Sequence, residues 1–389
     1  VIQVQLQFTE AITVDTSGGM PFVELGVGPT GNVGAAQYVA LTNDYIMLFE
    51  YTVQPGDYRM DLDYASTNSF ILNGAVVKDL SGSNAVLALP DVGAPGSLSD
   101  NKEINLDTIP PKVKKVTSVT PDDYYSTGSV INVEIEFDEA ITNVGPPRLD
   151  LNTTPLARAK LTNQPNDFVL QFGYTVSQGE NSPRLDYAAT NSLHLNSATI
   201  LDRAGNAADL TLPQPSWLEN RFIVIDTALP IPTVSSGNGR PTRVAPIPFD
   251  VTFNEDVTDF GIDGLIVENG KGTNFAGVGS NYSLDVTPFV QGGVTVTVAA
   301  AAARDRAGNW NSNSAPFVRI YDTVEPTPVM AWWDSSLKTT NSPIMMTVTF
   351  DEYVTNFTAS SLRVTNGIVS AVVTNDVVTK YGIQVSSNF

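Results

Sequence analysis

The sequence predicts an all-β protein made of several antiparallel β-sandwich domains that follow one another along the chain. Three observations predict it: apolar residues recur at every second position of short segments, one such segment returns four times, and helical periodicity is nearly absent. Strict alternation of apolar and polar residues is typical of a half-buried strand. Because the segment returns at a spacing of about 100 residues, the chain is a series of similar domains rather than one large fold.

The repeated segment is an alternating strand that ends in Phe-x-Glu. The four copies run from Ile2 to Phe8 with Glu10, from Ile131 to Phe137 with Glu139, from Ile247 to Phe253 with Glu255, and from Ile344 to Phe350 with Glu352. A glutamate two positions after an inward-facing phenylalanine keeps the inward phase of its strand. We therefore expect Glu139, Glu255 and Glu352 to lie near the end of their domain that faces the preceding domain.

A second element marks the domain boundaries. A strand that ends in Asp-Thr is followed within a few residues by proline, which fixes φ and stiffens the linker. The predicted domains are residues 1–107, 108–226, 227–322 and 323–389. Compared with its neighbours, the first domain lacks its first strand and the fourth lacks its C-terminal strands, so we expect the parent protein to be longer.

The composition excludes several classes of function. A formal net charge of −20 disfavours nucleic acid and anionic membrane surfaces as partners, and no apolar run is long enough to insert in a membrane. The absence of cysteine rules out disulfides, thiol catalysis and cysteine zinc sites. The single histidine, His194, lies between Leu193 and Leu195 with no partner motif, which is typical of a packing or surface residue. We therefore expect no enzyme activity.

Acidic residues at the predicted domain ends are candidate calcium ligands. Each Phe-x-Glu glutamate is expected to meet the aspartate of the Asp-Thr that ends the preceding domain, and clustered carboxylates suit a hard cation. Two copies of Asp-Arg-Ala-Gly-Asn are sharp turn signals that add a further aspartate each. The candidate ligands are Glu139, Glu255, Glu352, Asp107, Asp226, Asp322, Asp202 and Asp305. The alternative is that these acids only cap turns by accepting backbone N–H bonds.

Two further features concern the surface. Asn152, Asn281 and Asn356 open Asn-x-Ser/Thr sequons, which would accept glycans in a eukaryotic secreted protein. Trp332 and Trp333 are adjacent in one predicted strand, so alternation sends one of the two rings outward. An outward ring could stack on a sugar or pack on another chain.

The series Phe-x-Glu, Leu-Asp-Tyr, Asp-x-x-Gly-Asn and Asp-Thr-x-x-Pro resembles the immunoglobulin-like or cadherin-like tandem repeats of large microbial surface proteins. Such proteins include bacterial adhesins and extracellular fibre proteins of protists, and the resemblance covers essentially the whole chain. It implies tandem immunoglobulin-like antiparallel β-sandwich domains in a row, an extracellular or cell-surface location, and junctions stiffened by calcium. Because the spacing departs from the cadherin consensus, no ligand list is transferred.

These observations favour a structural extracellular protein, a segment of a stalk or filament built from immunoglobulin-like repeats. Calcium is the one expected cofactor, and other copies of the chain or other fibre and surface proteins are the expected partners. Two alternatives stay open. One is a cell-surface adhesin that binds a host, sugar or cell-surface ligand, and the other is a non-catalytic module of a polysaccharide-active enzyme.

Overall fold

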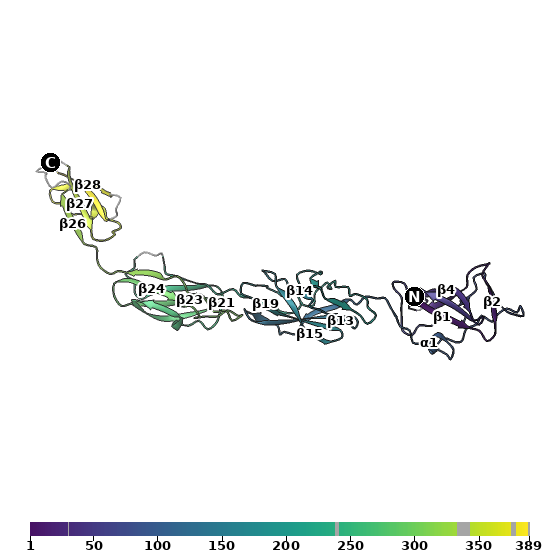
Figure 1. Cartoon of the computed structure of the whole chain (residues 1–389). Coiled ribbons are helices and arrows are strands. Elements are labelled where there is room, and N and C mark those ends of the chain that lie inside the picture. The colour runs from purple at the N-terminus through teal and green to yellow at the C-terminus, as the bar shows by residue number, and fades with distance from the viewer. Residues whose placement is uncertain (30, 238–240, 333–342, 375–378, 388–389) are drawn as a thin grey trace. The chain divides into compact units, whose positions relative to one another are not determined.

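The protein is an all-β chain, as predicted. A computed structural model describes residues 1–29, 31–237, 241–332, 343–374 and 379–387, and about 49% of the chain is strand against 3% helix. The chain divides into two compact units, Val1–Leu229 with Arg306–Asn309, and Pro230–Asp305 with Trp310–Phe389. The strands of both are shown in Figure 1. The short helices are α1 (Leu98–Asn101), η1 (Ile262–Gly264) and η2 (Ala359–Ser361).

The first unit begins with a five-stranded antiparallel sheet in the order β1-β5-β4-β3-β7. Two small antiparallel sheets, β2-β8 and β6-β9, accompany it. These strands are β1 (Ile2–Gln7), β2 (Ile12–Asp15), β3 (Phe22–Gly26), β4 (Val33–Thr42), β5 (Ile46–Tyr51), β6 (Tyr58–Arg59), β7 (Phe70–Ile71), β8 (Val76–Asp79) and β9 (Leu106–Asp107).

The first unit continues with a six-stranded antiparallel sheet in the order β10-β12-β16-β15-β14-β17. The same stretch of chain also forms an antiparallel pair, β13-β18, and a parallel pair, β11-β19. These strands are β10 (Val113–Ser118), β11 (Asp123–Tyr125), β12 (Val130–Phe137), β13 (Thr142–Val144), β14 (Arg148–Asp150), β15 (Arg158–Asn166), β16 (Val169–Thr175), β17 (Leu193–His194), β18 (Thr199–Leu201) and β19 (Ile223–Ile225).

The second unit contains three antiparallel sheets, in the orders β20-β21-β23, β22-β24-β25 and β26-β27-β29-β28. The strands are β20 (Pro232–Ser235), β21 (Ile247–Val257), β22 (Leu265–Glu268), β23 (Gly270–Pro288), β24 (Gly292–Val298), β25 (Phe317–Tyr321), β26 (Pro328–Trp332), β27 (Ile344–Phe350), β28 (Gly367–Thr374) and β29 (Lys380–Ser387).

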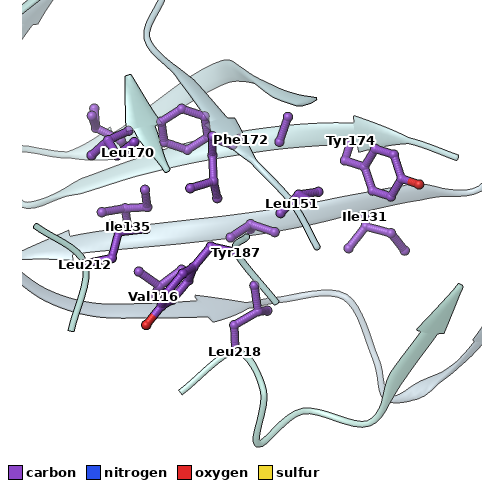
Figure 2. Close-up of a cluster of buried hydrophobic side chains, with 14 of the residues drawn as sticks. Val116, Ile131, Ile135, Leu151, Leu170, Phe172, Tyr174, Tyr187, Leu212 and Leu218 are labelled. Atoms are coloured by element: carbon purple, nitrogen blue, oxygen red, sulfur yellow. The ribbon is translucent and has the colours of Figure 1, made fainter. Parts of the chain in front are cut away.

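The Phe-x-Glu strands are half-buried, as their alternation predicts. In β12 the inward side chains from Ile131 to Phe137 are at most 1% exposed. They pack against inward residues of the paired strand β16, among which Phe172 is fully buried. Figure 2 shows this cluster, in which Leu212 and Leu218 face the strands from the other side. Burial of each such side chain stabilises the fold by about 1.5–3 kcal/mol, so the apolar residues at alternate positions of β12 stabilise the sheet.

The repeated Leu-Asp-Tyr fastens a long loop to the five-stranded sheet. Leu62 is fully buried and Asp63 is 2% exposed. The Asp63 carboxylate accepts hydrogen bonds from Ser99 Oγ at 2.7 Å and from the backbone N–H of Gly93 at 3.0 Å. Tyr64 then donates its hydroxyl to the carbonyl of Pro90 at 2.7 Å. The loop that crosses this end of the sheet is therefore held by the two polar residues of the motif.

The second copy of the motif repeats this arrangement beside the six-stranded sheet. Ser216 Oγ donates to Asp186 Oδ1 at 2.6 Å, and the hydroxyl of Tyr187 donates to the carbonyl of Pro213. The two copies therefore owe their sequence similarity to one shared structural task. The aspartate and the tyrosine of the motif attach an irregular segment to the sheet, and the leucine of the motif is part of the core.

Replacing Asp63 by asparagine tests this fastening. Burial alone would raise the pKa of Asp63, but hydrogen bonds from Ser99, Gly93, Tyr64 and Leu98 outweigh it and lower that pKa. A lowered pKa stabilises the folded state above the unfolded pKa, and this stabilisation is lost as pH falls through the folded pKa. We expect Asp63→Asn to cost about 1–3 kcal/mol near pH 7 and progressively less in acid, measured by urea unfolding.

Asp61→Asn is the matched control, because Asp61 is exposed and its backbone φ of 55° suits asparagine. We expect its unfolding free energy to stay within about 0.5 kcal/mol of the wild-type value. Equal effects of the two substitutions, or an Asp63→Asn effect that grows in acid, would contradict the assignment.

Candidate metal centre

Three carboxylates predicted as calcium ligands lie together in the first unit. Asp107 ends β9, Glu139 follows β12 by two residues, and Asp202 follows β18 directly. One carboxylate oxygen from each lies within 4.8 Å of the other two. Asp202 is only 6% exposed, whereas Asp107 and Glu139 are half-buried. The geometry thus brings Glu139 to the Asp-Thr aspartate, as expected, and adds the aspartate of the Asp-Arg-Ala-Gly-Asn turn.

The electrostatics of this cluster favour a cation. Burial raises the pKa of Glu139, and the neighbouring charges of Asp107, Asp202 and Asp138 raise it further. The carboxylates line a hollow of about 260 Å³. A positive ion in that hollow would stabilise the charged form of Glu139, which its surroundings otherwise disfavour.

Arg203 also lines this hollow, but it pairs with Asp167. Arg203 Nη2 lies 3.4 Å from Asp167 Oδ2, and both side chains are mostly exposed. An ion pair in water is weak and leaves the charge of the three inner carboxylates largely in place. The hollow therefore keeps an excess of negative charge.

Asn206 holds two of the three ligands in position. Its backbone N–H donates to Asp202 Oδ1 at 2.8 Å, and its Nδ2 donates to Asp202 Oδ2 at 2.6 Å and to the carbonyl of Asp107 at 3.1 Å. Gly205 has φ of 94°, a conformation that favours glycine and allows the turn. Turn capping is therefore part of the role of Asp202, while each of its oxygens keeps a lone pair that a cation could use.

The second Asp-Arg-Ala-Gly-Asn turn makes the same contact. Asn309 Nδ2 donates to the carbonyl of Asp226 at 2.9 Å, as Asn206 does to Asp107. Asp226 and Asp107 each also accept a backbone N–H from two residues later, at 3.0 Å in both cases. Sequence reasoning missed the positioning role of the two asparagines, although both copies of the motif end in this residue.

The remaining candidate ligands lie in the second unit. Glu255 is half-buried and Asp305 is 5% exposed, and their role as ligands, like that of Asp226, stays a prediction. Burial raises the pKa of Glu352, and the adjacent carboxyl group of Asp322 raises it further. A Phe-x-Glu glutamate and an Asp-Thr aspartate therefore meet here also, as the sequence led us to expect.

The other surface predictions have varied surroundings. Asn152 uses both ends of its amide, since Nδ2 donates to the carbonyl of Arg184 and Oδ1 accepts from Ser182 Oγ and from the N–H of Asp186. A glycan attached there would leave Nδ2 a single N–H for its bond to Arg184. Asn281 and Asn356 are exposed, and glycosylation of them stays a prediction. Trp332 is 61% exposed, whereas Trp333 lies outside the described residues.

The comparison with protein-family models agrees with the all-β structure described above. None of the helices in the described ranges is long and apolar enough to cross a membrane. A comparison of the chain with curated proteins gives no match. Residues 226–319 match a family model described as a bacterial Ig-like domain, a type of module that is commonly extracellular and typically non-catalytic. This chain therefore contains a segment similar to bacterial Ig-like domains, within an all-β protein of that fold class.

Proposed function

We propose that the chain is a structural segment of an extracellular stalk or filament, and that calcium bound by Asp107, Glu139 and Asp202 stiffens one of its junctions. The observation that carries the proposal is the convergence of these three carboxylates in one hollow. Asp107 ends the last strand before the linker that contains Pro110 and Pro111, and the other two follow it. A shared cation would therefore connect the chain on both sides of this linker.

Calcium fits this set of ligands better than other common metals do. It prefers six to eight oxygen ligands at about 2.3–2.6 Å, and it tolerates irregular geometry and water as additional ligands. The cluster offers carboxylate oxygen only, without the histidine or cysteine that zinc and copper sites use. Magnesium is a weaker candidate because it demands nearly ideal octahedral geometry at shorter distances.

The mechanism we propose is mechanical. Without a cation, three carboxylates at this distance repel one another and disfavour the packed junction. With a cation, the same groups attract a common centre, and the bond from Asn206 to the carbonyl of Asp107 is kept closed. The junction would then bend less, which is the property required of a stalk.

Calcium removal is the direct test of the proposal. We expect calcium to raise the melting temperature of the chain above that measured in EDTA, because the ion binds the folded state alone. At a free concentration of about a hundred times the dissociation constant this amounts to about 2.7 kcal/mol, or several degrees. Asp61→Asn should keep the full rise, because Asp61 is an exposed acid that is not among the residues lining the hollow. Melting curves that coincide with and without calcium would exclude the site.

Replacing Glu139 by glutamine should change the melting temperature in opposite directions in EDTA and in calcium. The raised pKa of Glu139 means that its charged form destabilises the metal-free fold, and this cost grows as pH rises from the unfolded value of 4.5 through the folded one. Glu139→Gln should therefore melt higher than the wild type in EDTA at neutral pH. In calcium it should melt lower, because a ligand is lost. A lower melting temperature in both conditions would mean that Glu139 only stabilises the turn.

A further inference from the structure

The six-stranded sheet carries a basic cluster on its outward side. Asp150 Oδ2 lies 3.1 Å from His194 Nε2, and its Oδ1 lies 3.4 Å from Arg148 Nε and 3.6 Å from Arg158 Nε. Lys160 is exposed and stands opposite Arg148 in the ladder of β14 and β15. We call Arg148, Arg158, Lys160 and His194, with Asp150, the basic face. In a chain with 21 lysines and arginines, one histidine and 41 acidic residues, such a concentration of basic residues is unexpected.

Stability does not explain the basic face. Arg148 and Lys160 are like charges directly opposite each other, a pairing that destabilises a sheet. The side chain of Arg158 is 62% exposed, and its Nε lies 3.6 Å from Asp150 Oδ1. An exposed ion pair of this kind stabilises the fold by at most about 1 kcal/mol. One carboxylate thus serves two arginines and a histidine, while Lys160 adds a further positive charge beside Arg148. An interaction partner would account for this arrangement.

The five-stranded sheet shows that the fold does not require these bases. Its strands β3, β4 and β7 pair in the same order as β14, β15 and β17. Phe22 stands opposite Gln37 and Ile71, as Arg148 stands opposite Lys160 and His194. In the same registers Glu24 stands opposite Ala35, as Asp150 stands opposite Arg158. The acid at this place is common to both sheets, whereas the bases occur in one of them only.

The five-stranded sheet instead borders an open hollow whose charged lining residues are Glu50 and the buried Asp57. The hollow measures about 600 Å³, and among the described residues that line it there is no lysine, arginine or histidine. Its walls include Gly34, Ala35, Gln37, Glu50, Tyr51 and Asp57. Glu50 lies opposite Gln37 in the ladder of β4 and β5 and is half-buried. We call this the acidic hollow. Its wall residue Ala35 occupies the position that Arg158 has in the six-stranded sheet.

We propose that the basic face of one copy of this chain docks on the acidic hollow of a second copy, with Arg158 and Lys160 directed toward Glu50. The two surfaces have opposite charge, and the hollow lies beside the exposed small side chain of Ala35, the position at which the six-stranded sheet has Arg158. Because the surfaces differ, each copy offers one of each, and the contact can propagate into an open-ended assembly. The inference rests on the filament part of the proposed function and is independent of calcium.

Sedimentation velocity of the full chain over a concentration series, in EDTA, tests the contact. Arg158→Ala with Lys160→Gln installs the residues of the five-stranded sheet, and Glu50→Gln changes the hollow. We expect self-association of the wild type, and an association constant at least about tenfold lower in either variant. Net repulsion alone predicts the opposite for Glu50→Gln, since it removes a negative charge from an acidic chain.

Matched controls separate the effect of losing the proposed contact from the effect of changing the net charge. Lys78→Gln with Lys102→Gln removes two positive charges from exposed sites outside the basic face, and Glu103→Gln removes one exposed acid outside the hollow. Both controls should associate as the wild type does. Unchanged melting curves of all variants would show that each is folded.

A mixture of the two contact variants gives the sharpest outcome. One variant keeps an intact hollow and the other keeps an intact basic face, so we expect an equimolar mixture to form one-to-one dimers and nothing larger. A monomeric wild type, variants that associate as the wild type does, equal losses in the controls, or a mixture that stays monomeric would each overturn the proposal. None of these results depends on calcium, so a failure here leaves the test of the junction unaffected.

Discussion

The inward phase of the alternating strands is the constraint on which the rest of this structure depends. It buries the apolar side of β12 from Ile131 to Phe137, and it continues for one more inward position to Glu139. At that position the side chain is no longer packed among apolar residues and lies beside Asp107 and Asp202. The same geometry that stabilises the sheet therefore desolvates a carboxylate at its end, where burial and three neighbouring acids raise its pKa.

The two sheets of the first unit show how one framework takes on different surfaces. Buried positions are used in the same way in both, and the motif aspartates Asp63 and Asp186 each accept a hydrogen bond from a serine hydroxyl, that of Ser99 in α1 and that of Ser216. Outward positions are free to differ, because a residue on the solvent side of a strand contributes little to packing. Arg158 and Ala35 occupy equivalent places, and one carries charge while the other opens a hollow.

How far the sequence predicts the structure depends on the range of each interaction. The strand from Ile131 to Phe137 and the turn at Gly205 follow from local pattern, and both were predicted. The meeting of Asp107 with Glu139 was predicted because two repeated motifs lie at neighbouring domain ends. The bonds of Asp63 to Gly93 and Ser99 were not, since no local pattern links an acid to a loop so far along the chain. The basic face arises only through strand register.

The parallel pairing of β11 with β19 has a consequence for a chain under tension. Asp123–Tyr125, near the start of the six-stranded sheet's segment, runs alongside Ile223–Ile225 at its end. Arg221 reinforces the pair by donating to Asp122 at 2.6 Å and to the carbonyl of Ser118 at 2.9 Å. A pull on the two ends of this segment would slide parallel strands past each other, loading their hydrogen bonds in shear and together. Rupture would then require all of them to break at once, rather than one after another as when a hairpin unzips.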